Sequence, residues 1–485
     1  MNRVLILSVG AILTSAALPA LADDYEQQFQ QRSQWYLKQI AAEDLPKLVQ
    51  WGKDHLKVDV GDPHKYLMPP IIARLAQNPQ DPQALEAYRW LMEVDKGKGD
   101  RGLYHFAAYP RTRMYFAFRD KLPKDITDSM LYDVTNFYGQ LRHGGTENHT
   151  WMHRATAYLW AEQLPEVGKQ PVPRDDQNRT NLQWSTDWLR SQVKKLYNVG
   201  QGEYDSSTYV VFSAAALSNV ADYASDPKMR NVAQAGLDWL AAAQAIKYFH
   251  GCNVGPEARG FAEAAVRSNT DWMNWLWFNA SARPINTADN TVVEDRDLKP
   301  SKHATVVLAL SKYRPHPVIR NIAAKNVKLP FEARGSKPAY DMSKPGKDQE
   351  YLYFADQYAM ATLYSPEDGI KTKGTILPQT TMFKLAIRDT NEVRTFGIAS
   401  GYHWHFPVEG RTPYDQYHQK RDAAVAITYV NKPEDQRTKH RSILAVPVGA
   451  PDPVRKDGWF FWQINKAYVA ARPLNGKADF ADLAK

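Results

Sequence analysis

Residues 148–163 read NHTWMHRATAYLWAEQ, and the spacing of apolar side chains in this stretch decides the fold of the first half of the chain. Its apolar residues recur three or four positions apart and fall on one face of an α-helix. Similar stretches, bounded by Pro, Gly, Asp or Asn, cover 82–92, 182–196, 206–224 and 227–240. Consecutive helical hairpins pack as a solenoid or close into an α/α toroid, and the lack of a strict repeat period disfavours a regular repeat array.

The pattern changes in the last third of the chain. Short runs rich in β-branched and aromatic residues, separated by polar or Gly/Pro turns, predict strands at 351–354, 360–364, 380–387, 393–398, 423–430, 442–448, 459–464 and 467–472. This spacing favours an antiparallel sandwich or layered sheet.

We therefore predict an α+β chain of two domains. An N-terminal α/α toroid, an incomplete barrel of helical hairpins, covers residues 23–280 and is the expected catalytic domain. Residues 281–330 form a helical transition, and an antiparallel β-domain covers 331–485.

The first 22 residues have the order of a cleavable signal peptide. Arg3 precedes an apolar run, and Ala20-Leu21-Ala22 supplies a small-x-small cleavage pattern before an acidic pair. The alternative, a membrane anchor, fits less well because polar residues, Gly and Pro interrupt the run. Cys252 is the only cysteine, so disulfides cannot hold an exported chain together and a periplasmic location is favoured over a secreted one.

Charge and aromatic content point to an acidic polysaccharide as partner. The net charge is +8, and the chain has 14 Trp and 26 Tyr, whose rings stack well on sugar faces. No Lys/Arg-rich run of the nucleic-acid-binding kind is present.

His403-Trp404-His405 puts two histidines on one face of a strand, but without a third ligand we predict neither a metal nor a cofactor.

The densest polar segment, residues 142–149, lies where a loop becomes a helix. Gly144 and Gly145 permit a tight turn, and Thr146 is the expected N-cap. The helix N-terminus would favour an anion and keep His149 neutral and able to accept a proton. The alternative is an elaborate helix cap with a satisfied histidine.

Two further segments complete the candidate site. Residues 202–209 open another helix, with Asp205 or Ser206 as its cap, and contain Tyr204 and Tyr209. If helices alternate between inner and outer rings, both tyrosines lie at one mouth of the toroid with Asn148 and His149, although core packing is an alternative, especially for Tyr209. Residues 250–260 place Arg259 between two glycines, as either a ligand-binding loop or an ordinary surface loop.

The chain resembles the α/α-toroid polysaccharide lyases, the group of chondroitin, alginate and heparin lyases. The resemblance rests on the architecture, on Glu147-Asn148-His149 at an inner-helix start and on Gly202-Glu203-Tyr204 before the next inner helix. It also includes residues 459–462 (WFFW) and 467–473 (AYVAARP) near the C-terminus.

The resemblance implies β-elimination on a uronic-acid polymer. Asn148, with Arg259, would neutralise the uronate carboxylate, His149 would be the base, and Tyr204 the acid, with Tyr209 in reserve; in some such lyases one tyrosine fills both roles. The remaining expected substrate-binding residues are Glu147, Arg142 and His250.

Two other classes of function remain open. A glycoside hydrolase on the same kind of toroid would use Glu147 as acid and Asp205 or Glu203 as base. A non-catalytic envelope protein would bind an acidic glycan and leave its length unchanged.

Overall fold

The computed structural model describes residues 18–55, 63–95, 101–259, 269–278, 285–286, 291–292, 304–338, 342–343, 346, 348–364, 380–389, 393–399, 415–428, 443–447 and 449–474. Of the predicted signal peptide, only the last five residues fall in these ranges, where they begin helix α1. His403-Trp404-His405 lies outside them, as do residues 281–284, 287–290 and 293–303 of the predicted 281–330 transition.

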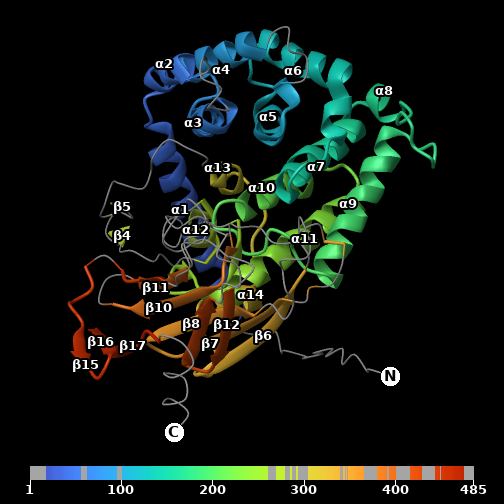
Figure 1. The fold of residues 1–485 in the computed structure, drawn as a ribbon. Helices are drawn as coiled ribbons and strands as arrows, with labels where there is room; N and C mark the ends of the chain where they lie inside the picture. The colour runs from blue at the N-terminus through green and yellow to red at the C-terminus, as the bar shows by residue number, and fades with distance from the viewer. Residues whose placement is uncertain are drawn as a thin grey trace.

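Helices make up the first half of the described chain, as predicted. They are α1 (Leu18–Ala41), α2 (Leu45–His55), α3 (Pro63–Gln77), α4 (Pro82–Asp95), α5 (His105–Phe118), α6 (Lys124–Phe137), α7 (Glu147–Gln163), α8 (Pro165–Gly168), α9 (Asn181–Asn198), α10 (Val210–Tyr223), α11 (Pro227–Lys247), α12 (Asn269–Phe278), α13 (Thr305–Ala309) and α14 (Pro317–Ala323). Two 3-10 turns, η2 (Arg101–Leu103) and η3 (Tyr138–Arg142), join them. In Figure 1, α3, α5, α7 and α10 lie inside an arc made by α2, α4, α6 and α9.

Side-chain caps set the starts of several helices close to where the sequence predicts them. At α9, Thr180 and Gln183 form a reciprocal capping box. Asp226 accepts a hydrogen bond from the backbone N–H of Lys228 at the start of α11. Each cap satisfies backbone donors that would otherwise lack a partner in the first helical turn.

Helix α10 begins at Val210, four residues after the predicted start at Ser206. Tertiary hydrogen bonds hold the preceding residues out of the helix: Ser206 Oγ donates to the Arg259 carbonyl at 2.9 Å, and the Ser207 N–H donates to Glu257 at 3.0 Å. Ser206 Oγ also accepts from the Tyr209 N–H at 3.1 Å, so its hydroxyl closes a local turn in place of a helix cap.

Strands begin at residue 248 and, apart from α12, α13 and α14, make up the regular structure of the rest of the described chain. Short strands β1 (Tyr248–Phe249), β2 (Cys252–Asn253), β3 (Glu257–Ala258), β4 (Ile285–Asn286) and β5 (Thr291–Val292) precede β6 (Phe331–Lys337), β7 (Asp348–Phe354), β8 (Tyr358–Tyr364), β9 (Thr380–Thr381), β10 (Phe383–Arg388), β11 (Val393–Ala399), β12 (Asp415–Lys420), β13 (Ala423–Thr428), β14 (Ile443–Ala445), β15 (Val454–Lys456), β16 (Trp459–Ile464) and β17 (Ala467–Ala471). The sequence predicted neither the two-residue strands β1–β5, two of which lie in the expected helical transition 281–330, nor β6, β12 and β15, which are polar or only partly apolar.

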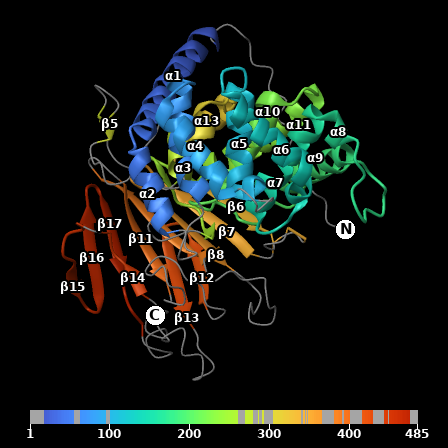
Figure 2. The same ribbon diagram turned by 90° about the horizontal axis from the view of Figure 1, so that it is seen from above.

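Every strand pair among the described residues is antiparallel. The largest sheet has six strands in the order β14-β11-β10-β8-β7-β6, and β15-β16-β17 forms a separate three-stranded sheet. Figure 2 shows the strands gathered on one side of the helices. The α+β class and the antiparallel C-terminal region are therefore confirmed.

Buried charged side chains connect the helical half to the six-stranded sheet. Lys337 on β6 lies 2.8 Å from Asp205 and 3.1 Å from Glu350, and Lys247 at the end of α11 also pairs with Asp205. Burial alone would raise the pKa of Asp205, but the two ammonium groups hold it below its ordinary value. The charges on the two halves therefore compensate one another.

Within the described residues, no helix is both long enough and apolar enough to cross a lipid bilayer.

Replacing Asp205 by Ala should destabilise the protein strongly. The change leaves two buried lysines facing Glu350 alone, and an uncompensated buried charge costs about 3–5 kcal/mol. The free energy of unfolding in urea measures the effect. Asp128→Ala, which breaks an exposed pair with Lys124 on α6, is the control and should cost less than about 1 kcal/mol. Equal losses in both variants would contradict the role given to the buried charges.

Candidate functional site

Two predicted segments and Arg259 meet at the carboxylate of Glu203, which is only 1% exposed. Its Oε2 accepts hydrogen bonds from the Asn148 backbone N–H at 3.0 Å and from Asn148 Nδ2 at 2.6 Å. Its Oε1 accepts from Arg259 Nη1 at 2.6 Å. The structure thus brings together three residues that are up to 111 positions apart in the sequence.

The N-terminus of α7 uses Glu203 as its cap. Thr146 occupies the N-cap position, as predicted, but its side chain makes no cap hydrogen bond to the backbone and instead accepts from Asn148 Nδ2 at 3.1 Å. Glu203 supplies the negative charge that a helix N-terminus favours. The Asn148 side chain is fully buried and its amide N–H groups point to Thr146 and Glu203, so in this arrangement it positions Glu203 and is not placed to bind a substrate carboxylate.

Glu147 also lies in this buried group. Its Oε2 accepts from the Glu203 backbone N–H at 2.5 Å, and its Oε1 accepts from Trp151 Nε1 at 3.3 Å. Burial, followed by the nearby charge of Glu203, raises the pKa of Glu147 to about 8. Glu147 therefore holds a proton at neutral pH.

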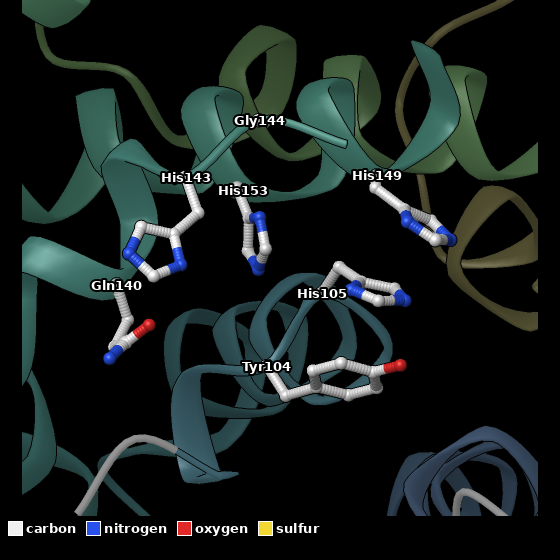
Figure 3. Close-up of a pocket in the computed structure, with 7 residues that line it drawn as sticks. All are labelled: Tyr104, His105, Gln140, His143, Gly144, His149 and His153. Carbon is white, nitrogen blue, oxygen red and sulfur yellow. The ribbon is translucent and has the colours of Figure 1, made fainter. Parts of the chain in front are cut away.

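Next to this group lies an open cavity of about 260 Å³, lined mainly by histidines. Its walls are Tyr104, His105, Gln140, His143, Gly144, His149 and His153. Figure 3 shows His149 and His153 reaching in from α7, opposite Tyr104 and His105 at the start of α5. The rings of His105 and His149 lie face to face with their centroids 3.5 Å apart.

The electrostatics of the cavity keep these imidazoles neutral. Burial, followed by the positive charge of Arg259, lowers the pKa of His149 to about 3. Burial likewise lowers the pKa of His105 to about 2 and that of His153 to about 4. At neutral pH each ring has one nitrogen able to accept a proton, in a region of positive potential.

The two candidate tyrosines lie in different surroundings. Arg259 stands 4.2 Å from the centre of the Tyr209 ring, and Tyr209 belongs to an aromatic cluster that continues through Phe212 and Phe106 to His149. The Tyr204 ring packs instead with strand residues such as Met360, Leu363 and Phe383. These contacts associate Tyr209 more closely than Tyr204 with the His149 side of the site.

Of the predicted site residues, all of which the structure describes, His149 is the one that lines the cavity. Arg142 and His250 also stand apart from the group around Glu203. Arg142 donates from Nη1 to Asn181 at 2.7 Å, at the start of α9, so its side chain joins two helices. His250 forms the turn between β1 and β2 with a positive φ of 45°, and its ring packs on Phe249. Burial lowers its pKa.

Four residues that line the cavity were not predicted from the sequence: Tyr104, His105, Gln140 and His153. His153 carried a usable signal, because it lies four residues after His149 and residues so spaced share one helix face. His105 and Tyr104 come from a helix about forty residues earlier in the chain, and only the packing of α5 against α7 brings them to the cavity.

No group of three or more His, Cys, Asp or Glu side chains in the described ranges is arranged to hold a metal ion.

The raised pKa of Glu147 predicts a specific pH dependence of stability. An acid whose folded pKa lies near 8 and whose ordinary value is 4.5 binds more protons in the folded state, so stability falls as pH rises between these values. Glu147→Gln mimics the protonated form and should remove this part of the fall. Urea unfolding of both proteins between pH 4.5 and 8 measures it. The exposed Glu166→Gln is the control; parallel wild-type and Glu147→Gln curves would contradict the assignment.

No protein-family model, curated protein or solved structure matches the chain, so the case for a function rests on the geometry of this site.

Proposed function

We propose that the protein is a polysaccharide lyase that cleaves an acidic, uronic-acid-containing polymer by β-elimination. The observation that carries the proposal is His149: a neutral imidazole in the wall of an open cavity, with its pKa lowered in part by the charge of Arg259. A base and a cation close together are what the reaction needs, because the proton to be removed is adjacent to a carboxylate.

The proposed steps balance without water or a cofactor. Arg259 stabilises the negative charge that develops on the uronate carboxylate, and His149 removes the proton from C5. The C4–O bond then breaks as the C4–C5 double bond forms. Tyr209 donates its phenolic proton to the departing glycosidic oxygen, and its contact with Arg259 supports this choice over Tyr204.

Glu203 and Asn148 act in this proposal as positioning residues. Glu203 orients the Arg259 guanidinium from one oxygen and receives the start of α7 on the other. The next residue along α7 is His149, so the same carboxylate fixes the helical turn that carries the base.

The finer architecture belongs to the same proposal. We infer an incomplete α/α toroid for the helical half, supported by the inner and outer helices of Figure 1. A layered β-domain is supported by the β12–β13 hairpin, whose Tyr417 and Gln419 contact Met360 on β8. We further propose that residues 1–22 are a signal peptide and that the protein acts in the periplasm or outside the cell.

A glycoside hydrolase is the second candidate, favoured by one observation. The pKa of Glu147, raised to about 8, is that of a carboxyl group that keeps its proton for general acid catalysis. Against it, both candidate bases are engaged: Asp205 pairs with two lysines, and Glu203 pairs with Arg259. Glu147→Gln separates the two, because a hydrolase would lose nearly all activity whereas a lyase would retain most of it.

The first prediction from this proposal concerns the base. The purified protein, incubated with alginate, chondroitin sulfate, hyaluronan and polygalacturonate, should release products that absorb in the ultraviolet as unsaturated uronates from at least one polymer. His149→Ala should lower turnover by about 10²-fold or more. His316→Ala, an exposed histidine at the start of α14, is the matched control and should leave turnover unchanged. Saturated products, or full activity in His149→Ala, would contradict the mechanism.

A second prediction compares the tyrosines. Tyr209→Phe keeps the ring that packs against Arg259 and removes only the hydroxyl, so turnover should fall by about 10²-fold with the fold intact. Tyr204→Phe should have a much smaller effect. Steady-state rates on the cleaved polymer and the circular dichroism of both variants measure this. The reverse order of the two losses would return the acid role to Tyr204.

A further inference from the structure

The three-stranded sheet β15-β16-β17 exposes aromatic side chains on one face. Residues 459, 461 and 463 of β16 alternate with the buried Trp462 and Ile464, so they point away from the rest of the protein. Phe461 is 40% exposed and Tyr468 on β17 is 77% exposed.

Strand register shows that these residues share one surface. Phe461 pairs with Val454 on β15 and Ala470 on β17, and Gln463 pairs with Tyr468. Directly paired residues point to the same side of a sheet. The rings of Trp459 and Phe461 lie 6.2 Å apart with an interplanar angle of 30°. We call the surface formed by Trp459, Phe461 and Tyr468 the aromatic face.

The opposite face of this sheet is occupied by the protein itself. Trp462 packs edge-on to Phe396 on β11, with ring centroids 5.7 Å apart, and Ile464 and Ala467 belong to the same buried cluster. Burial of that side holds the sheet in place. The aromatic face therefore contributes little to this core, yet it carries large apolar rings that are costly to expose to water.

Lys456 lies on the aromatic face, in a segment with a net positive charge. Residues 452–472 contain four basic side chains, Arg455, Lys456, Lys466 and Arg472, against two acidic ones, Asp452 and Asp457. Lys456 pairs directly with Trp459 across the strands, and both Lys456 and Lys466 are exposed. Rings flanked by cations suit a ligand with flat apolar faces and negative charges.

We propose that the aromatic face is a second, non-catalytic binding surface for an acidic polysaccharide chain. The ligand class rests on the proposed function, whereas the surface itself rests on the register and exposure of β15-β17. Sugar rings would stack on Trp459, Phe461 and Tyr468 while their carboxylate or sulfate groups face Lys456 and Lys466.

The position of the aromatic face gives it a role distinct from that of the cavity. In Figures 1 and 2, β15-β17 lie at the outer end of the strand region, away from α5 and α7, which carry the histidines. A long chain held there raises the local concentration of cleavable linkages at the cavity, whereas a short oligosaccharide bound at the cavity gains nothing. The surface therefore distinguishes polymers from short substrates.

Affinity electrophoresis of the full chain tests the proposal. The His149→Ala protein, in which cleavage is slowed, is run in gels containing alginate, chondroitin sulfate or polygalacturonate, and in gels with neutral hydroxyethylcellulose. At least one acidic polymer should retard it. Phe461→Ala and Tyr468→Ala, added singly to this background, should each raise the apparent Kd by about 2- to 10-fold, the scale of a lost aromatic contact. Tyr132→Ala, a 62% exposed tyrosine on α6, is the matched control.

The outcomes distinguish this surface from the catalytic site and from other occupants. Retardation that is weakened in Tyr468→Ala supports the surface even if no polymer is cleaved, so failure of the lyase proposal is seen separately. No retardation in any acidic gel, retardation unchanged by both variants, or retardation only in the neutral gel would overturn it. A dimer in sedimentation analysis that Phe461→Asp dissociates would instead identify a second copy as the occupant and would also overturn it.

Discussion

The carboxylate of Glu203 is the group on which the candidate site depends. A carboxylate this deeply buried is tolerated only when charged or polar donors surround it, and here the start of α7, the Asn148 amide and Arg259 fill that requirement. Because these donors lie some 55 residues before and after Glu203, satisfying one charge fixes where α7 and Arg259 stand relative to each other. His149 follows Asn148 on α7, so the same contacts fix its position.

The β-domain supports the site through the loop that carries Glu203. Residues 201–209 are all buried although they form neither helix nor strand, so their polar groups need partners from elsewhere. Asp205 pairs with Lys337 from the sheet, and the Ser207 N–H donates to Glu257, which pairs in turn with Lys384 on β10. The strands thus fix the position of the 201–209 loop, which carries Glu203 and the two candidate tyrosines. This contact gives a physical reason for joining the helical half to the sheet.

The sequence predicted the elements better than their contacts. Apolar periodicity and caps located both ends of α7 and α9 and the start of α11 to within about two residues, because local spacing determines them. It misplaced the start of α10, where tertiary hydrogen bonds to Ser206 and Ser207 outweigh helix formation. It also assigned a ligand-binding role to Asn148, whose amide the fold commits to Glu203. Such hydrogen bonds depend on partners far away in the chain, and local sequence patterns do not identify those partners.

The neutral histidines give the proposed chemistry a dependence on substrate charge. With the cavity open, burial and the charges of Arg259 and Lys65 make His149 a weak base. In the proposed reaction, a uronate carboxylate bound beside Arg259 would offset that positive potential. The negative charge would favour the imidazolium form of His149 and so raise its pKa at the step in which His149 takes up the proton. A neutral sugar of the same shape would fill the cavity without raising the pKa of His149. In the proposed reaction, the electrostatics that hold His149 neutral would therefore also favour an acidic substrate, because a negatively charged ligand would raise the pKa of the base.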